Sequence, residues 1–223
     1  MGRCVSVVIP TLNEAENIGR LVDRLRSCFP GVEIIVADGG SEDGTADRVE
    51  SPATLVSSGK GRACQMNAGA RAASGDILWF LHADCWPTDA SVDLIFEALD
   101  DPAVVGGGFR WGLDGSKWYY GICTSLSHIK NKLRRSLFGD MGIFVRRETF
   151  ERLGGYAEIP ICEEIEFNNR LKRTGKTVIL DEVLQSSDRR LLMEGPLWAF
   201  VKNDLIKLGF AVGVSPDTLK KFY

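Results

Sequence analysis

The chain has 223 residues, of which 44% are hydrophobic and 26% are charged, so it can bury a core and is neither disordered nor collagen-like. Lys and Arg number 27 against 30 Asp and Glu, and the formal net charge of −3 lacks the basic excess of a dedicated nucleic-acid binder. We therefore expect one folded unit without a nucleic-acid partner.

Cysteine spacing and hydropathy indicate the compartment. The six cysteines form no CxxC pair, and no secretory signal precedes the first apolar run. No run approaches the roughly 18 consecutive apolar residues of a transmembrane helix. These patterns predict a cytoplasmic protein whose membrane contact is at most peripheral, on the inner face, and they leave a homo-oligomer open.

The first hundred residues alternate between two apolar patterns. Short runs of branched residues predict strands, and apolar residues three and four apart predict the helices between them. This alternation is typical of a parallel α/β sheet with right-handed crossovers. The turn Asp43-Gly44-Thr45 is expected to cap a short helix. We expect strands over residues 5–10, 33–38, 53–57 and 76–81, and helices over 18–29, 62–73 and 89–99.

The rhythm changes after about residue 100. Fewer strands and longer helical patterns predict a sheet that is mixed in direction at its edge. The aromatic cluster Trp118, Tyr119 and Tyr120 is expected to pack in the core, although aromatic rings also suit sugar or lipid acceptors. We expect strands over residues 104–111, 142–146 and 177–180, helices over 118–135, 147–153 and 163–174, and two more helices within 196–223.

Common phosphate and metal motifs are absent from the sequence. Gly175-Lys176-Thr177 resembles the end of a P-loop, but Arg170 stands where that motif needs glycine. The glycine run that begins at Gly106 does not continue as GxGxxG. Two histidines are too few for a His-rich zinc site.

Polar residues follow three predicted strands at the point where each strand ends. In a parallel sheet, ligands bind beyond these carboxyl ends. Carboxylates gathered at one edge repel each other, and a nucleotide with a divalent cation would relieve that repulsion. The residues are Pro10, Thr11, Asn13 and Glu14 after the first strand, Asp38, Gly39 and Gly40 after the second, and His82 and Asp84 after the fourth.

Two of these carboxylates suggest separate roles. Asp38 could accept a hydrogen bond from a base N–H, with the two glycines letting the ring approach, although turn chemistry alone also explains Asp-Gly-Gly. Asp84 could supply a hard oxygen ligand to a cation that also holds a diphosphate.

A cluster of acids, Glu163, Glu164 and Glu166, begins a predicted helix. The helix dipole favours acids there, which could explain two of them. Alternatively, one carboxylate with a raised pKa acts as general base on a hydroxyl. Glu163 and Glu164 are the candidates, because Glu166 points elsewhere on a helix.

Taken in order, SVVIPTLNE, VADGGSEDGT, GKGRACQMNAGARAASGDILWFLHAD, GDMGIFVRRETFERLGGY and EEIEFNNRLKRTG resemble the family 2 glycosyltransferases of the GT-A fold over residues 4–180. The ending GVSPDTLKKFY is similar to that of a short bacterial subset associated with radical-SAM or selenoprotein domains. The resemblance implies a Rossmann-like, mostly parallel sheet flanked by helices. It divides one domain, 1–223, into a nucleotide-binding half (1–100), an acceptor and catalytic half (101–190) and a helical tail (191–223).

The resemblance also implies a reaction. A sugar would move from a nucleoside diphosphate sugar of the UDP type to a hydroxyl acceptor of unknown identity, by inverting single displacement with Mn²⁺ or Mg²⁺. Asp84 and His82 would face the metal, and Glu164, with Glu163 beside it, would be the catalytic base. The implied nucleotide-sugar contacts are Pro10, Thr11, Glu14, Asp38, Gly39, Gly61, Gln65, Asn67, Ala83 and Asp84.

Three departures from the family pattern qualify these expectations. His82 replaces the first acid of the usual DxD motif, which affects metal binding. Met66 replaces an arginine common in the family, and Arg62, one helical turn away, could substitute for it. The segment from Gln185 to Arg190 lacks the Trp of processive members, so polymer synthesis is disfavoured.

Two other functions stay open at this point. A catalytically idle nucleotide-sugar binding protein would explain the departures at His82 and Met66. A nucleotidyltransferase is disfavoured, because the loop TLNEAEN after the first strand is acidic rather than Gly-rich and basic. The tail helix with Trp198, Leu205 and Leu208 could lie at a membrane interface, but packing on the sheet or on a second subunit is the more common outcome.

Overall fold

A computed structural model describes residues 3–115 and 117–223, without the side chains of Arg190, Pro196 and Leu197. At its centre is an eight-stranded sheet with the order β3-β2-β1-β4-β7-β6-β8-β5. The strands are β1 (Val5–Thr11), β2 (Glu33–Asp38), β3 (Thr54–Ser57), β4 (Ile77–Phe80), β5 (Cys85–Trp86), β6 (Val104–Asp114), β7 (Phe144–Arg146) and β8 (Lys176–Ser187).

The direction of the strands changes in the middle of the sheet. Strands β3, β2, β1 and β4 are parallel, whereas β7 is antiparallel to both of its neighbours, β4 and β6. Strand β8 runs parallel to β6, and β5 is antiparallel to β8. The expected α/β fold with a parallel first half and a mixed second half is confirmed.

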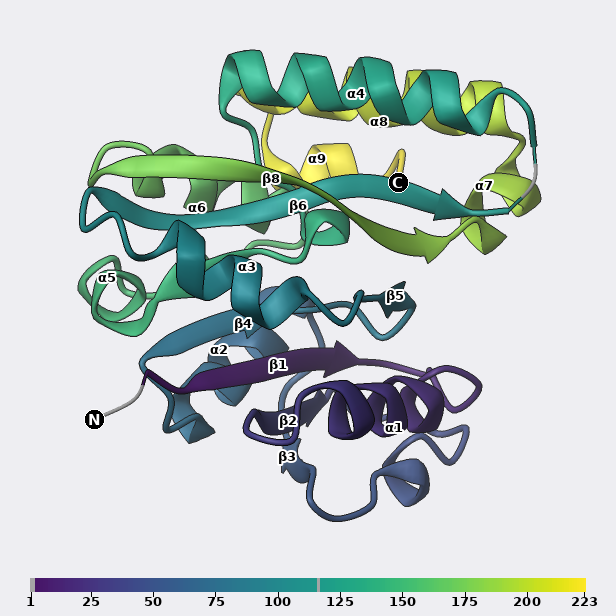
Figure 1. Ribbon diagram of the computed structural model, residues 1–223. Coiled ribbons are helices and arrows are strands. Elements are labelled where there is room, and N and C mark those ends of the chain that lie inside the picture. Colours follow the sequence, from purple (N-terminus) through teal and green to yellow (C-terminus); the bar gives the residue numbers. More distant parts are fainter. Residues whose placement is uncertain (1–2, 116) are drawn as a thin grey trace.

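Helices cover both faces of the sheet. Helices α4 and α8 lie together above β6 and β8, while α1 lies beside β1 and β2 at the opposite end (Figure 1). No helix within the described residues is long and apolar enough to cross a bilayer. The helices are α1 (Ile18–Cys28), η1 (Ala46–Arg48), α2 (Arg62–Ala72), α3 (Ser91–Ala98), α4 (Tyr120–Arg134), η2 (Gly139–Met141), α5 (Arg147–Arg152), α6 (Glu163–Leu171), α7 (Arg189–Glu194), α8 (Pro196–Ala211) and α9 (Pro216–Lys220).

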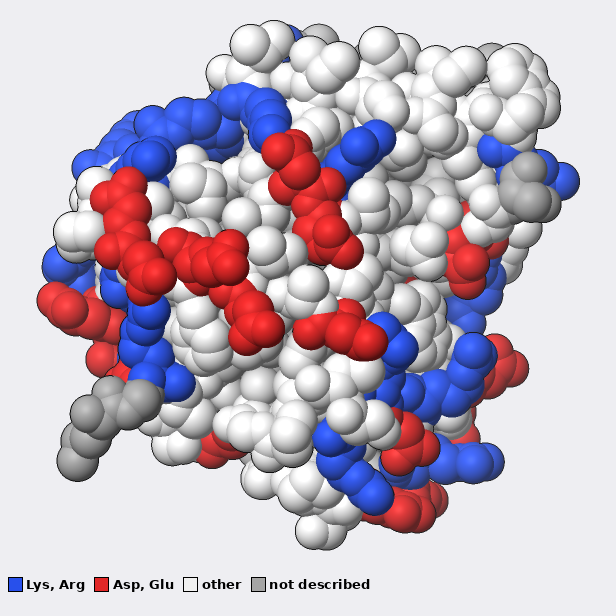
Figure 2. Space-filling view, in the orientation of Figure 1, with Lys and Arg blue, Asp and Glu red and all other residues white. Residues whose placement is uncertain are grey.

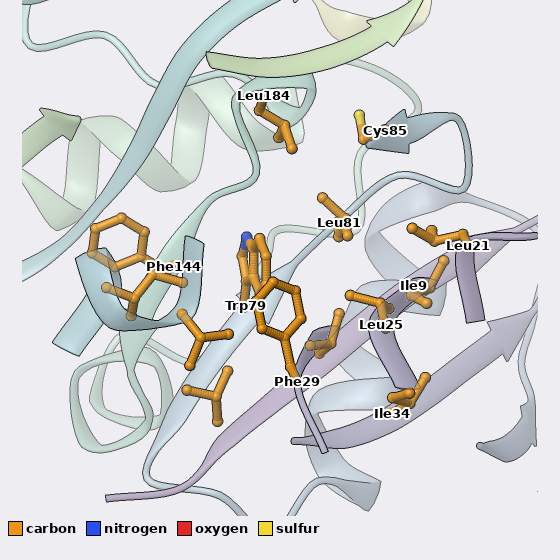
Figure 3. Close-up of a cluster of buried hydrophobic side chains, with 14 of the residues drawn as sticks. Ile9, Leu21, Leu25, Phe29, Ile34, Trp79, Leu81, Cys85, Phe144 and Leu184 are labelled. Carbon is orange, nitrogen blue, oxygen red and sulfur yellow. The ribbon is translucent and has the colours of Figure 1, made fainter. Parts of the chain in front are cut away.

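Strand β1 is buried on both faces, which explains its unbroken apolar sequence. Val7 and Ile9 belong to a core cluster shared with α1 and α3, and Val8 belongs to the cluster on the α2 side. Trp79 lies in the first cluster, 6.2 Å from Phe29 between ring centroids (Figure 3). Both clusters include residues of β1, β2 and β4, the strands whose carboxyl ends carry the predicted site.

The small residues of α2 let this helix approach the sheet closely. A Cβ atom at Gly69 would collide with Val8 of β1, so only glycine fits at this contact. The close packing holds the start of α2, with Gly61 as the residue before it, next to the ends of the strands.

Three local predictions were wrong. Strand β8 has 12 residues rather than the predicted short strand, because β6 pairs with it over almost its whole length. Trp118 is 82% exposed rather than packed in the core, although Tyr120 is buried. The Thr45 side chain does not cap η1; its hydroxyl accepts a hydrogen bond from the Glu14 backbone N–H at 2.8 Å.

Candidate active site

A cavity of about 640 Å³ opens beyond the carboxyl ends of β1 and β4, a size typical of small-molecule sites. It brings together most of the residues predicted from the sequence. Nine of the thirteen line it: Pro10, Glu14, Gly61, Gln65, His82, Ala83, Asp84, Glu163 and Glu164. The four outside its lining are Thr11, Asp38, Gly39 and Asn67.

Two walls face each other across this cavity. The strand-end wall comes from the loops after β1 and β4 and from the start of α2. The helix wall comes from α4, α6 and α8. The strand-end wall comprises Pro10, Glu14, Gly61, Arg62, Gln65, His82, Ala83 and Asp84, and the helix wall comprises Lys130, Asn131, Glu163, Glu164, Asn203 and Lys207.

The loop after β1 is fastened to the loop after β2 by hydrogen bonds. The Asn13 N–H donates to Ser41 Oγ at 2.8 Å, and the Ala15 N–H donates to Asp43 Oδ2 at 3.0 Å. Asn13 adopts a left-handed φ of 57°, which asparagine tolerates better than most residues. The turn after β2, through Ser41 and Asp43, therefore holds the loop that carries Glu14.

Asp38 lies in a tight turn at the end of β2. Its carboxylate accepts hydrogen bonds from the Gly40 and Ser41 N–H groups, both at 2.9 Å, and from the Ser41 hydroxyl. Burial opposes ionisation, but these hydrogen bonds outweigh it and lower the pKa of Asp38. These contacts are the ones expected of an aspartate that stabilises a turn. A contact between Asp38 and a nucleotide base stays a prediction.

Asn67 and Gln65 face different surroundings on α2. The Asn67 side chain donates to the Tyr156 carbonyl at 2.8 Å and accepts from the Tyr156 N–H at 2.9 Å, so its amide ties α2 to the chain before α6. Gln65 donates to the Thr11 carbonyl and lines the cavity. A nucleotide contact of Asn67 would require this pairing to break.

The side chain of Asp84 fits a divalent cation. Ligand atoms of His82, Asp84 and Cys85 lie within 4.8 Å of one another. Burial raises the pKa of Asp84 and outweighs the charges of His82 and Arg189, and a bound cation would lower that pKa. Burial also keeps Cys85 a neutral thiol, with its pKa well above the usual value. Asp84 is therefore the best ligand of the three.

His82 connects the two walls. Its Nδ1 lies 3.2 Å from Asp140 Oδ1, and its Nε2 lies 3.2 Å from Glu164 Oε1. Burial and the charge of Arg62 disfavour the imidazolium, but the two hydrogen bonds outweigh them and raise the pKa of His82 to about 10. With a carboxylate oxygen beside each ring nitrogen, the imidazolium is the favoured form and can donate to both carboxylates, and the metal contact of His82 stays a prediction.

The adjacent glutamates at the start of α6 differ in charge state. Burial disfavours an ionised Glu164, but the His82 hydrogen bond and Arg62 outweigh it and lower the pKa of Glu164. Burial and the Glu164 charge raise the pKa of Glu163 to about 7. Arg62 lies 3.6 Å from Glu163 Oε1 and 3.8 Å from Glu164 Oε1. Among described residues, the buried Glu163 Oε1 has no hydrogen-bond donor.

Gly139 is required by the closeness of these groups. A Cβ atom there would collide with Glu164 Oε1 and with the His82 ring. Glycine at the start of η2 therefore lets Asp140 approach His82.

Sequence reasoning assigned no active-site role to Asp140, Lys130 or Lys207. Asp140 reaches His82 from 58 positions further along the chain, and its only local signal is the glycine before it. Lys130 and Lys207 stand on helical faces that are indistinguishable from solvated ones in sequence. Arg189 lines the cavity and lies 3.7 Å from Glu14; the Arg190 side chain lies outside the described part of the structure.

Sequence comparison identifies relatives of this chain. The sequence model described as Glycosyl transferase family 2 matches residues 6–152. Glycosyltransferase AglE from Haloferax volcanii is 29% identical over 168 residues, which are 68% of this chain and 55% of that protein. Dolichol-phosphate mannosyltransferase from Pyrococcus furiosus is 29% identical over 242 residues, 92% of this chain and 68% of the relative. The chain thus spans about half the length of the Haloferax protein.

Solved structures share the fold. A mannosyltransferase from Pyrobaculum calidifontis, in complex with GDP-Man and Mn²⁺, superposes with a TM-score of 0.68 at 23% identity, over 83% of this chain and 57% of that chain. Glucosyl-3-phosphoglycerate synthase from Mycobacterium tuberculosis, in complex with Mn²⁺, UDP and phosphoglyceric acid, gives a TM-score of 0.66 at 25% identity, over 96% and 80%.

Proposed function

The chain belongs to glycosyl transferase family 2, and on that premise we propose that it transfers a sugar from a nucleoside diphosphate sugar to a hydroxyl-bearing acceptor. One observation carries the proposal. A single cavity holds a cation-competent carboxylate, Asp84, on the strand-end wall and the buried carboxylates Glu163 and Glu164 on the helix wall. Two solved structures that share the fold hold GDP-Man or UDP together with Mn²⁺, which supports the proposal.

Each wall has a separate task in this reaction. Asp84 would hold Mn²⁺ or Mg²⁺, which when bound neutralises charge on the departing diphosphate. Pro10, Glu14 and Gln65 line the same wall and would position the donor. A glutamate of the helix wall takes the proton of the acceptor hydroxyl as its oxygen bonds to the sugar carbon and the bond to the diphosphate breaks. A single displacement of this kind inverts the anomeric centre.

The environment of the two glutamates bears on which one is the base. Glu164 is the first candidate by family resemblance, but it is held ionised between His82 and Arg62 and is a weak base in that setting. Glu163 keeps an oxygen without a described hydrogen-bond donor and has a pKa of about 7, which suits proton transfer near neutral pH. We therefore assign proton transfer to this pair, with Glu163 the favoured member.

Calorimetric titration with UDP, GDP and TDP, each with and without Mn²⁺ or Mg²⁺, tests the donor site. We expect metal-dependent binding of one nucleotide and loss of the metal dependence in Asp84→Ala. Chelation of the metal should remove the same increment in the unmodified protein. A melting curve checks that the variant is folded.

Two results would change the proposal. Equal nucleotide binding with and without metal would overturn the role of Asp84. Metal-dependent binding without hydrolysis or transfer across a range of sugar donors and acceptors would favour the idle binding protein. The UDP-type donor, the acceptor, the bacterial subset, the cytoplasmic location and any homo-oligomer stay predictions.

A further inference from the structure

Two neighbouring helices expose an apolar ridge on their outer sides. On and just before α4, every large apolar side chain at intervals of three or four residues is more than half exposed. Helix α8 and its C-cap show the same pattern, with exposed fractions from 44% to 72%. The ridge comprises Trp118, Ile122, Leu126, Ile129 and Leu133 from the first helix, and Trp198, Val201, Leu205, Leu208 and Val212 from the second.

The ridge points away from the body of the protein. Helix α4 buries Tyr120, Thr124 and Asn131, which lie on the face opposite the ridge. Lys130 Nζ lies 3.2 Å from Asp204 Oδ1, so the two helices are adjacent, as Figure 1 also shows. A surface helix of a monomeric protein usually exposes polar residues there. An apolar outer face of this length indicates an interaction surface.

Charge is strongly segregated onto the same helices. Residues 117–135 contain five Lys or Arg and no Asp or Glu, and residues 196–223 contain four Lys and two Asp. These segments together carry a formal charge of +7, and the rest of the chain carries −10. Lys130, Lys207 and Lys220 line the cavity and Lys202 is buried, so the positive charge available to the outer surface comes mainly from the residues that flank α4. In Figure 2 the upper part of the molecule, over α4, is largely uncharged with Lys and Arg at its ends, and most Asp and Glu lie lower.

We propose that the α4–α8 ridge docks on the surface of a lipid bilayer with anionic headgroups. The apolar side chains would enter the boundary between headgroups and acyl chains, and the exposed basic residues near the ends of α4, Lys117, Lys132, Arg134 and Arg135, would contact the anionic headgroups. Each half of the ridge begins with a tryptophan, Trp118 or Trp198, a side chain enriched at membrane interfaces. A second copy fits less well, because a symmetric dimer through this face would bring two positive surfaces together.

The ridge lies on the outside of the helices that form the helix wall. Lys130 and Asn131 of α4, and Asn203 and Lys207 of α8, reach the cavity from the inner faces. Docking would therefore hold the cavity about one helix diameter, roughly 10 Å, from the headgroups. The docking itself follows from exposure and charge and does not depend on the proposed reaction.

Vesicle sedimentation tests the proposal. The full chain is mixed with vesicles of phosphatidylcholine alone or of equal parts phosphatidylcholine and phosphatidylglycerol. We expect binding to the anionic vesicles, weakened by high salt because salt screens the basic residues. The double variant Leu126→Glu with Leu205→Glu should bind at least about tenfold less, since it places two charges in the apolar layer. The substitution Leu55→Glu, on β3 at the far end of the sheet, is the matched control and should bind normally.

Further measurements separate the outcomes. Thermal unfolding and nucleotide titration of each variant show whether it is folded, and Leu126→Gln with Leu205→Gln repeats the test if the glutamate variant is not. Sedimentation with neither vesicle, or equal binding by the ridge and control variants, would overturn the proposal. Light scattering that shows a dimer abolished by the ridge variant, without vesicle binding, would assign the face to a second copy instead.

Discussion

The two walls of the cavity are built differently. The strand-end wall is made of short loops within the first 84 residues, held largely by backbone groups such as the N–H groups of Asn13, Glu14 and Ala15. The helix wall collects side chains from three helices of the second half, and charged groups join it to the opposite wall through His82 and Arg62. We call the loops of the first wall, which backbone hydrogen bonds hold, the frame. We call the charged groups that link the two walls, Arg62, His82, Asp140, Glu163 and Glu164, the network, because each lies next to another charged member.

This difference predicts where substitutions act. A change in the network should alter the protonation of its neighbours and therefore the rate of reaction. A change in the packing behind the frame should alter stability first. The five predictions below run from the largest expected effect to the smallest.

The largest effect is expected at the glutamate pair. Glu163→Gln should lower kcat by about 10²- to 10⁴-fold while nucleotide binding is retained, because the amide cannot accept the acceptor proton. Glu164→Gln should lower kcat less, since Glu164 positions His82 in this assignment. Steady-state kinetics and calorimetry of both variants measure this. A larger loss in Glu164→Gln would reassign the base to the residue first indicated by the family resemblance.

Gly139→Ala should damage the network without damaging the frame. The added methyl group collides with Glu164 and the His82 ring, and a displacement of this kind in a catalytic group costs about 10²-fold in rate. Nucleotide affinity should change little, because Pro10 and Gln65 lie on the strand-end wall. Kinetics and calorimetry on one preparation compare the two quantities. An equal loss of both would show that the walls are not independent.

The dependence of kcat on pH should reflect the pKa values of Glu163 and His82. The pKa of Glu163 is about 7, so its basic form decreases as pH falls below that value, and kcat should fall about tenfold per pH unit there. The pKa of His82 is about 10, so the protonated imidazole and its two hydrogen bonds persist until the pH rises through that value.

The free energy of unfolding should also change with pH as Glu163 and His82 titrate. Glu163 has a raised pKa, so its contribution to the free energy of unfolding is fully present below its ordinary pKa and is lost as pH rises toward 7. The contribution of His82 is fully present below its ordinary pKa and is lost as pH rises through about 10. Denaturant unfolding of the unmodified protein and Glu163→Gln across this pH range tests the stability change, and rate profiles of the same two proteins test the acid limb. An acid limb near pH 7 that persists in the variant would assign that limb to another group.

The smallest effects are expected on stability alone. Gly69→Ala should lower the free energy of unfolding by about 1–3 kcal/mol, because its methyl group overpacks the contact between α2 and Val8. Gly121→Ala is the matched control on α4, where a Cβ meets nothing within 4 Å, and should raise stability by about 0.5–1 kcal/mol. Denaturant unfolding measures both. Equal effects would contradict the close packing of α2.

The sequence by itself determined the order of the elements, the parallel first half of the sheet and most of the strand-end wall. These features follow from apolar periodicity and from the rule that ligands meet the carboxyl ends of parallel strands, and both are properties of neighbouring residues. It also marked Glu163 and Glu164 as the candidate bases, although it ranked them by resemblance alone.

Only the tertiary structure decided the length of β8, the pairing of Asp140 with His82 and the different charge states of the two glutamates. It also decided that Asn67 ties the chain to Tyr156 and that the apolar sides of α4 and α8 face outward. Each of these depends on contacts between residues far apart in the chain. Burial and charge at a given position are set by those distant partners, so no local pattern contains them.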